Sequence, residues 1–274
     1  MESLNEAIEN HYLKEGLFED IINRLEEQDV DLDKVQRSHI SGVDEFHVRG
    51  AAVSKELANS IDMKGLHVLD VGCGLGGPCR MLADEYDCTS TGIDLSNEYI
   101  KTAAKLSKLV NLDSKTTFTQ GDAVKLPFED DAFDVVWTQH VQMNIPDKNK
   151  FYSEIKRVLK KNGHLLYYDI FKKGDSKVSY PMPWASKSNQ SFLFDLENKN
   201  QILNNLGFSK IETKNQTQKG IDFFEALVVK LKEVGPPKMG LNVLMGETTK
   251  QKLVNLMNHL KDEKLVLESG TYKY

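Results

Sequence analysis

Short apolar runs alternate with helical segments between residues 66 and 171. Such runs are typical of strands buried on both faces, and apolar residues three or four positions apart are typical of amphipathic helices. The runs predict strands at residues 66–71, 88–93, 116–120, 133–137 and 163–171. Helices are expected from about Pro78, at residues 97–109 with Ser96 as N-cap, and at residues 147–160. Because parallel strands need crossover connections, this alternation predicts a doubly wound, mostly parallel α/β sheet.

Helical patterns also flank this central region. Before it, Leu4, Ile8 and Tyr12 open a helical spacing over residues 4–25 that breaks at Gly16, and a further helix is expected at 51–60 after an irregular segment at 36–50. After it, a polar loop at 172–191 precedes expected helices at 194–206, 223–233 and 248–261 and strands at 210–213 and 265–272, which makes seven strands in all. We expect N-terminal helices (1–60) that form part of a lid, a ligand-binding core (61–171), and a cap insert with the last strands (172–274).

Composition narrows the class of protein. The 274 residues include 35 Lys+Arg and 41 Asp+Glu, a net charge of −6, with 40% hydrophobic and 28% charged residues, which is the balance of a soluble globular protein. Apolar stretches fall far short of the roughly 20 residues that a membrane span needs, and residues 1–10 are too polar for a signal peptide. The three cysteines form no CxxC pair, so neither a zinc site nor a disulfide framework is expected. A net negative chain without a long basic run is not expected to bind nucleic acid, so small molecules are the expected partners. The short apolar stretches and the cysteine pattern lead us to expect a cytoplasmic protein with no membrane partner.

The strongest local signal is a glycine-rich turn after the first predicted strand, Asp70-Val71-Gly72-Cys73-Gly74-Leu75-Gly76-Gly77. Glycines allow a tight turn and let a ligand touch the backbone, and the helix that follows offers unpaired N–H donors. Dinucleotide-binding sites use a similar turn, so the glycines alone leave the ligand open. Asp70 lies before the glycines, where its carboxylate would repel a pyrophosphate and attract a cation. We therefore expect a ligand that carries positive charge.

Two more acids follow the next two predicted strands. Asp94 ends the second strand, where its carboxylate can accept hydrogen bonds from both hydroxyls of a ribose. Asp122 follows Gly121 after the third strand and can accept a hydrogen bond from the exocyclic amine of an adenine. Ligands of such sheets bind at the carboxyl ends of the strands, so the three acids are expected to lie around one nucleoside.

With these motifs in order, residues 66–171 closely resemble the class I S-adenosylmethionine-dependent methyltransferases. The segment Phe46-His47-Val48-Arg49-Gly50 and the Gly-Leu-Gly-Gly-Pro turn further resemble the sarcosine/dimethylglycine N-methyltransferases and their ubiquinone-pathway-like (type 11) relatives. The resemblance implies a Rossmann-like sheet, S-adenosylmethionine as cofactor and no metal. It places Asp70 and its glycines at the methionine end, Asp94 at the ribose and Asp122 at the adenine. The expected cofactor-binding residues are Arg49, Asp70, Gly72, Cys73, Gly74, Gly76, Asp94, Leu95, Ser96, Gly121, Asp122, Ala123 and Gln139.

Methyl transfer from a sulfonium is an in-line displacement, so the protein has to align donor and acceptor and exclude water. An amine acceptor has to arrive deprotonated, and His140, just after the fourth strand, is the candidate catalytic base. Asn144 in the same turn, and Tyr180 and Trp184 in the loop at 172–191, are the other expected acceptor contacts, since aromatic faces favour methylated ammonium groups. The best expectation is a sarcosine- or dimethylglycine-like amine.

The sequence leaves other interpretations open. A cap rich in phenylalanine would also suit carbon or oxygen methylation of a ring or quinone-like metabolite. A nicotinamide-dependent oxidoreductase has a similar glycine turn, although Asp70 argues against it, and a non-catalytic S-adenosylmethionine-binding regulator is a third possibility. His140 also fits the role of a packed residue, Arg49 that of a surface ion pair, and the Tyr180–Trp184 region that of a loop anchor. The pattern does not distinguish a monomer from a homodimer.

Overall fold

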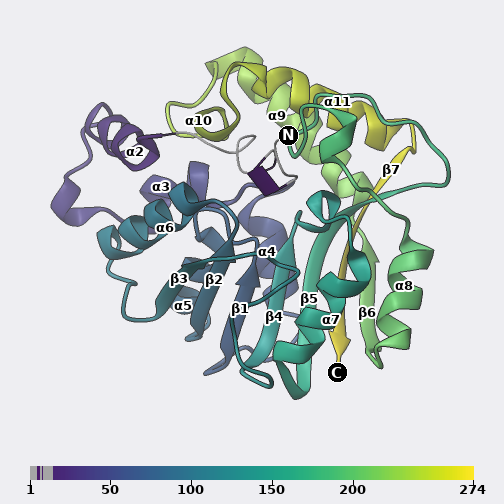
Figure 1. Ribbon diagram of the computed structural model, residues 1–274. Helices are drawn as coiled ribbons and strands as arrows, with labels where there is room; N and C mark the ends of the chain where they lie inside the picture. The colour runs from purple at the N-terminus through teal and green to yellow at the C-terminus, as the bar shows by residue number, and fades with distance from the viewer. Residues whose placement is uncertain (1–4, 7, 9–14) are drawn as a thin grey trace.

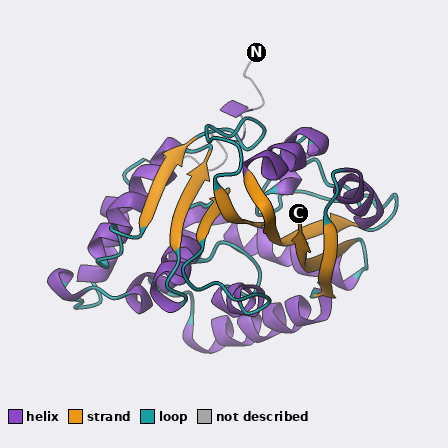
Figure 2. Ribbon diagram, turned by 90° about the horizontal axis from the view of Figure 1, so that it is seen from below, coloured by secondary structure: helices purple, strands orange, loops and turns teal. Residues whose placement is uncertain are grey.

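The computed structural model describes residues 5, 6, 8 and 15–274. The expected helical spacing through Leu4 and Tyr12 lies outside these residues. Within the described part, a seven-stranded sheet runs through the centre in the order β3-β2-β1-β4-β5-β7-β6 (Figure 1). Helices cover both faces of the sheet (Figure 2). The expected doubly wound α/β fold is confirmed.

The sheet is parallel except at one strand. Strands β1 to β5 pair in parallel, whereas β7 runs antiparallel to both β5 and β6. The strands are β1 (His67–Val71), β2 (Thr89–Asp94), β3 (Thr116–Gln120), β4 (Phe133–Gln139), β5 (Leu159–Lys172), β6 (Ser209–Asn215) and β7 (Leu265–Lys273). Each of the seven expected strands is present, and β5 begins earlier than the sequence pattern predicts.

Ten helices connect or flank these strands in the described part of the chain. They are α2 (Leu17–Glu26), α3 (Arg37–Asp44), α4 (Ala51–Ala58), α5 (Gly77–Glu85), α6 (Asn97–Leu109), α7 (Lys148–Val158), α8 (Leu196–Asn205), α9 (Thr217–Val234), α10 (Asn242–Met245) and α11 (Thr249–Lys261). Ser96 is the N-cap of α6, as expected, and its hydroxyl accepts a hydrogen bond from the Tyr99 amide at 3.3 Å. The loop between β5 and α8 holds only one short 3₁₀ turn, at Ser188–Gln190.

Alternate residues of the strands build two separate cores. Val68 and Trp137 belong to a cluster that includes residues of α4, α9 and α11. Their neighbours Leu69 and Val136 belong to a second cluster, with residues of α7 and α8. Successive strand side chains point to opposite faces, so both faces of the sheet are buried. This double burial explains the continuous apolar runs in the sequence and leaves the strand ends as the place for polar chemistry.

One expectation for the N-terminal part was wrong. The segment at 36–50 was expected to be irregular, but it contains α3. Gln36 and His39 form a reciprocal capping box at its start, and Ile40 and Val43 are buried in a cluster shared with α2 and α6. Gly42 fits there because a Cβ atom at this position would lie 2.3 Å from the carbonyl oxygen of Met239. Tertiary packing therefore stabilises a helix that a glycine-containing, weakly periodic segment does not predict.

Candidate functional site

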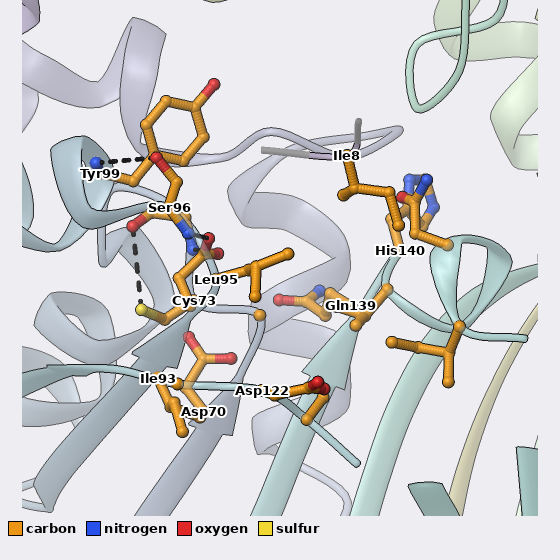
Figure 3. A pocket seen from close by; sticks show the side chains of 18 of the residues that line it. Ile8, Asp70, Cys73, Ile93, Leu95, Ser96, Tyr99, Asp122, Gln139 and His140 are labelled. Carbon is orange, nitrogen blue, oxygen red and sulfur yellow. Dashed lines mark hydrogen bonds between the residues drawn. The ribbon is translucent and has the colours of Figure 1, made fainter. Parts of the chain in front are cut away.

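A pocket lies at the carboxyl ends of β1, β2 and β4 and in the turn after β3. Figure 3 shows Asp70, Asp122, Gln139 and Ile8 around it. Most of the residues expected to bind cofactor or acceptor line this one pocket, namely Asp70, Gly72, Cys73, Gly74, Asp94, Leu95, Ser96, Gly121, Asp122, Ala123, Gln139, His140 and Asn144. The parallel register of the strands brings them together, because neighbouring strands end at the same edge of the sheet.

The glycine turn after β1 has the backbone conformation that its composition predicts. Gly72 and Gly74 have φ of 75° and 53°, a region that residues with a Cβ atom rarely adopt. A Cβ atom on Gly72 would also lie 2.3 Å from Cγ2 of Val141. Asp94 fixes the turn from the next strand, since its Oδ2 accepts the Gly74 N–H and its Oδ1 accepts the Ser96 N–H, both at 2.9 Å. The turn and the end of β2 thus form one unit in the pocket wall.

Asp70 is buried beneath this turn. Its side chain is 2% exposed, and Cys79 Sγ donates to its Oδ2 at 3.6 Å. The pKa of Asp70 is raised from 3.8 to about 7, mainly by burial; the hydrogen bond from Cys79 opposes this rise and the negative charge of Asp94 adds to it. A cation placed in the pocket would favour the charged form of this carboxyl group.

His140 lies on the other side of the pocket, directly after β4. It has a positive φ of 53°, and its ring centroid lies 4.9 Å from that of Tyr168 and 5.9 Å from that of His47. Burial, with a smaller contribution from His47, holds the pKa of His140 well below its ordinary 6.5. Its Nε2 is buried without a hydrogen-bond partner among the described residues. The imidazole is therefore neutral and carries an unsatisfied polar atom beside the pocket.

A buried network, which no sequence pattern indicated, supports this side of the pocket. His47 lines the pocket, and its Nε2 lies 3.1 Å from Glu45 Oε2, from Ser54 Oγ and from Gln139 Nε2. Gln139 Oε1 also accepts the indole N–H of Trp137 at 2.8 Å. Burial lowers the pKa of His47 to about 3 and raises that of Glu45 to about 8, so both groups are neutral near pH 7. The segment at 46–50 was noted in the sequence, but no pattern indicated that His47 faces the ligand.

The N-terminal segment also reaches the pocket. Asn5 and Ile8 belong to its lining, and Asn5 Nδ2 donates to Asp122 Oδ2 at 2.9 Å. In the view of Figure 3, Ile8 lies above Gln139 and beside His140. Asp44 and Phe46, at the end of α3 and just after it, line the same pocket. Sequence periodicity contains no signal for these contacts, since they join segments far apart in the chain.

Four expected residues lie outside the lining of this pocket. Arg49 pairs with Glu56 at 2.6 Å and donates to Gln216 Oε1 at 3.0 Å. Gly76 precedes α5, where its φ of 79° and the nearby ring of Phe118 leave no room for a side chain.

Tyr180 and Trp184 are the other two, and they pack against the core on the α4, α9 and α11 side of the sheet. Trp184 is 3% exposed and donates its indole N–H to Ser191 Oγ at 2.9 Å. Asn144 connects this loop to the pocket, because its Nδ2 donates to the carbonyl of Trp184 at 2.9 Å. The loop after β5 is therefore fixed to the turn after β4, but none of its residues belongs to the described pocket lining.

The described residues contain neither a membrane-spanning helix nor a group of metal ligands. No helix among them combines the length and the apolar character that crossing a membrane requires. No three His, Cys, Asp or Glu side chains in this part of the chain are grouped to hold a metal ion. The three cysteines in it, Cys73, Cys79 and Cys88, are buried and free.

Comparison with known proteins agrees with this geometry. Residues 69–167 match a family described as "Methyltransferase domain". Phosphoethanolamine N-methyltransferase 2 from Caenorhabditis elegans is 30% identical over 211 residues, which cover 77% of this chain and 46% of that protein. Ajmaline N-methyltransferase from Rauvolfia serpentina is 41% identical over 103 residues, 38% of this chain and 35% of that protein. Other matches, named for methylation of carbon or oxygen, cover 41% to 60% of this chain. The chain spans 30% to 49% of the length of these curated relatives.

The fold has close counterparts among solved structures. Phosphoethanolamine N-methyltransferase 2 from Haemonchus contortus, crystallised with S-adenosyl-L-methionine, aligns with a TM-score of 0.72 at 20% identity. The alignment covers 92% of this chain and 59% of that chain. This likeness shows a shared Rossmann-like fold, with the pocket described above at the carboxyl ends of its strands.

Proposed function

We propose, from the premise that residues 69–167 form a methyltransferase domain, that the chain transfers a methyl group from S-adenosylmethionine to an amine nitrogen of a small molecule. The observation that carries this proposal is the buried Asp70 under the glycine turn, with Asp94 and Asp122 in the wall of the same pocket. A sulfonium and an ammonium group supply the positive charge that these carboxylates favour, whereas a pyrophosphate would be repelled.

The remaining cofactor contacts follow from the strand ends. Asp94 is assigned to the ribose hydroxyls and Asp122 to the adenine amine, since the two acids follow neighbouring strands. The glycine turn with Cys73 is assigned to the methionine end of S-adenosylmethionine. Gln139 is assigned to the opposite side of the pocket. Asn5 and Ile8 support a lid role for the N-terminal segment, because both lie on the pocket.

In the transfer, the lone pair of the acceptor amine forms a bond to the methyl carbon while the bond from that carbon to sulfur breaks. The electron pair of the broken bond stays on sulfur, which leaves as a neutral thioether, and a methylated ammonium that still carries a proton releases it to water. The neutral imidazole of His140 is suited to accept a hydrogen bond from the amine and so to orient its lone pair, because its Nε2 is unsatisfied and its pKa is lowered. Orientation and exclusion of water supply much of the acceleration in such displacements.

An amine is preferred to a carbon or oxygen acceptor because no described lining residue is a lysine or arginine that would stabilise an enolate or phenolate. Buried free cysteines fit a reducing, cytoplasmic setting.

Turnover of methyl-labelled S-adenosylmethionine with a panel of small amines, phenols and carbon acids tests this proposal. Label in the amine products, located by mass spectrometry, is the expected result. Label in phenols or carbon acids would favour the alternative acceptors. Tight binding of a nicotinamide dinucleotide with none of S-adenosylmethionine would contradict the methyltransferase assignment itself.

A further inference from the structure

The pocket wall offers negative charge and, among the described residues, no formal cation. Its acids are Asp44, Asp70, Asp94, Asp122 and Asp147, and no lysine or arginine belongs to the described lining. The acceptor side also contains uncharged polar side chains, such as His47, His140 and Asn144, and the apolar residues Ile8, Phe46, Val141 and Ile145. This charge distribution bears on the acceptor, because an anion buried without a partner is costly.

Three buried or half-buried cations outside the described lining already have partners. Arg80, which is fully buried, donates to Asp44 and to the carbonyl of Leu75, both at 2.6 Å. Lys148 donates its Nζ to the carbonyl oxygens of Gln142 and Ile145, behind the turn after β4. Arg49 forms the ion pair with Glu56 already described. None of these three belongs to the lining, so none faces an incoming acceptor.

The two histidines of the wall are neutral because burial lowers the pKa of each ring. His47 is enclosed by Glu45, Ser54 and Gln139, which leaves its ring in a buried polar network. The ring of His140 lies 5.9 Å from that of His47 and 4.9 Å from that of Tyr168, and no acid among the described residues raises its pKa. A neutral imidazole can donate or accept a hydrogen bond, but it cannot pair with a carboxylate or phosphate as an ion.

The backbone of the turn after β4 does not form an anion site either. The amide of His140 donates to the Tyr168 carbonyl at 2.9 Å, and that of Gln142 donates to Asp169 Oδ2 at 3.3 Å. The amides of Asn144 and Ile145 donate to carbonyls within the turn at 3.0 Å. At the start of α7, where a helix dipole favours an anion, the place is taken by Asp147, which accepts the Lys150 N–H at 2.9 Å.

We propose that the acceptor carries no anionic group and is a neutral or cationic amine on an apolar skeleton. The inference rests on the proposed methyltransferase function and narrows its substrate class. The reacting amine has to be deprotonated, so a carboxylate or phosphate on the same molecule would have no protein cation in the described lining to pair with, and the cationic cofactor would already be paired with the acids of the wall. Sarcosine and dimethylglycine are carboxylates and phosphoethanolamine is a phosphate monoester, so each is disfavoured here in comparison with its uncharged analogue.

Fractionated metabolites test this inference even though the acceptor itself is unidentified. A small-molecule extract of the source cells is divided on an anion-exchange resin, and each fraction is incubated with the full chain and methyl-labelled S-adenosylmethionine. Labelled product is expected from the unretained fraction. Product formed mainly from the retained, anionic fraction would overturn the inference but leave the methyltransferase function intact. Absence of transfer from both fractions would overturn the function on which the inference rests.

Pairs of amines that differ only by an anionic group, and a variant with an added lysine, test the inference directly. N-methylphenethylamine is compared with N-methylphenylalanine, and ethanolamine with phosphoethanolamine, and the anionic member of each pair is expected to react at least about tenfold more slowly. Ile145→Lys adds a cation to the wall and should reduce that difference, whereas the matched control Ile145→Met should keep it. Binding of S-adenosylmethionine confirms that both variants fold. Equal rates within the pairs for the wild-type chain, or an unchanged difference in folded Ile145→Lys, would overturn the inference.

Discussion

At the residue scale, Asp70 illustrates how burial prepares a side chain for a charged ligand. The carboxyl group is 2% exposed in a pocket that contains other acids, and its pKa is raised to about 7. The fold therefore keeps the carboxyl group of Asp70 partly protonated near pH 7, and a cation beside it would favour loss of that proton. In the sequence, Asp70 was also the residue that favoured a cationic ligand over a pyrophosphate.

This property predicts pH-dependent cofactor binding. Below about pH 7, binding of S-adenosylmethionine has to release the proton of Asp70, so affinity should fall by up to tenfold for each pH unit. Calorimetry in buffers of different ionisation enthalpy measures both the affinity and the released proton. Asp70→Asn should bind more weakly at every pH and lose most of the pH dependence. A wild-type affinity that stays constant between about pH 6 and pH 7 would contradict this role.

Asp94 is expected to act both on the ligand and on the glycine turn. It accepts the amides of Gly74 and Ser96, so its removal loosens the pocket wall as well as deleting the proposed ribose contact. Asp94→Ala should weaken binding of S-adenosylmethionine by about 1–3 kcal/mol, the usual cost of losing charged hydrogen bonds. Asp94→Asn, which keeps one acceptor oxygen, should lose less. Unchanged affinity in calorimetry would remove Asp94 from the proposed site.

His140 should affect turnover and leave cofactor affinity nearly intact. Its unsatisfied Nε2 lies on the acceptor side, so His140→Ala should lower kcat by about tenfold, the value of a lost orienting hydrogen bond. Because its pKa lies well below 6.5, the wild-type rate should show no inflection from this group between about pH 6 and pH 8. Steady-state kinetics with the identified acceptor measures both effects. An unchanged kcat would assign His140 a packing role only.

At the element scale, one buried arginine joins three helices. Arg80 on α5 pairs with Asp44 at the end of α3 and donates to the carbonyl of Ala103 and to Ser107 on α6. Its guanidinium is fully buried, so the pairing decides how the N-terminal helices sit on the glycine turn. Gly77 belongs to the same junction, since a Cβ atom there would lie 1.9 Å from the carbonyl oxygen of Asp44.

Removal of one partner of the Arg80–Asp44 ion pair should therefore lower the stability of the protein strongly. Asp44→Ala leaves the Arg80 charge buried and uncompensated and should lower the free energy of unfolding by about 3–5 kcal/mol. Lys105→Ala, which breaks the exposed pair with Glu19, should cost less than about 1 kcal/mol and serves as the control. Urea denaturation measures both. Similar small losses in the two variants would show that the α3–α5 junction does not depend on the ion pair.

Elements differ in how well the sequence predicts them. The bounds of α6 and β3 were predicted to the residue, because a clear N-cap, strong periodicity and a short apolar run leave one solution. The predicted start of α9 fell six residues late, at Phe223 instead of Thr217, because Gly220 and polar residues weaken the pattern there. Gly220 lies against Leu267 of β7, so packing against the sheet favours the helix at that point.

At the scale of the whole molecule, buried ionisable groups couple stability to pH. Burial raises the pKa of Glu45 to about 8 and those of Asp70 and Asp169 to about 7. In the unfolded chain these groups ionise near 4.5 and 3.8, so above those values it binds fewer protons than the folded protein. Their contribution to stability is full below the unfolded values and is lost as the pH rises toward 7–8. His47 and His140 act in the opposite sense below their ordinary 6.5. Lys148, whose pKa burial lowers from 10.5 to about 7, also acts in the opposite sense, but only above about pH 7.

The ligand-free protein should therefore become less stable between about pH 6.5 and pH 7.5, where the three acids outweigh the histidines and Lys148, by up to about 1.4 kcal/mol per pH unit for each net proton involved. Urea denaturation at several pH values in this interval measures the slope. Glu45→Gln should reduce it, since the amide cannot ionise. S-adenosylmethionine should also reduce it, because a cation favours the ionised Asp70. A stability that rises with pH over this interval would contradict the assigned states of these groups.

The sheet, the glycine turn and the acids that follow three neighbouring strands were all predictable from the amino-acid sequence. These features lie within single strand–turn–helix units, where hydrophobic period, glycine and a nearby carboxylate specify the structure over a few residues. The positions of Asp70, Asp94 and Asp122 around one pocket followed from that pattern and from the rule that parallel strands end together.

The distant segments that complete the pocket became identifiable only in the folded chain. Folding places Asn5, Ile8 and His47 in the wall and leaves Arg49 and Trp184 outside the described lining, one in an ion pair and the other in the core. Such contacts depend on how segments far apart in the chain pack against each other, and the period of apolar residues specifies only which face of a segment is buried. The choice of partner for that face arises from shape, buried charge and hydrogen bonding in the folded molecule.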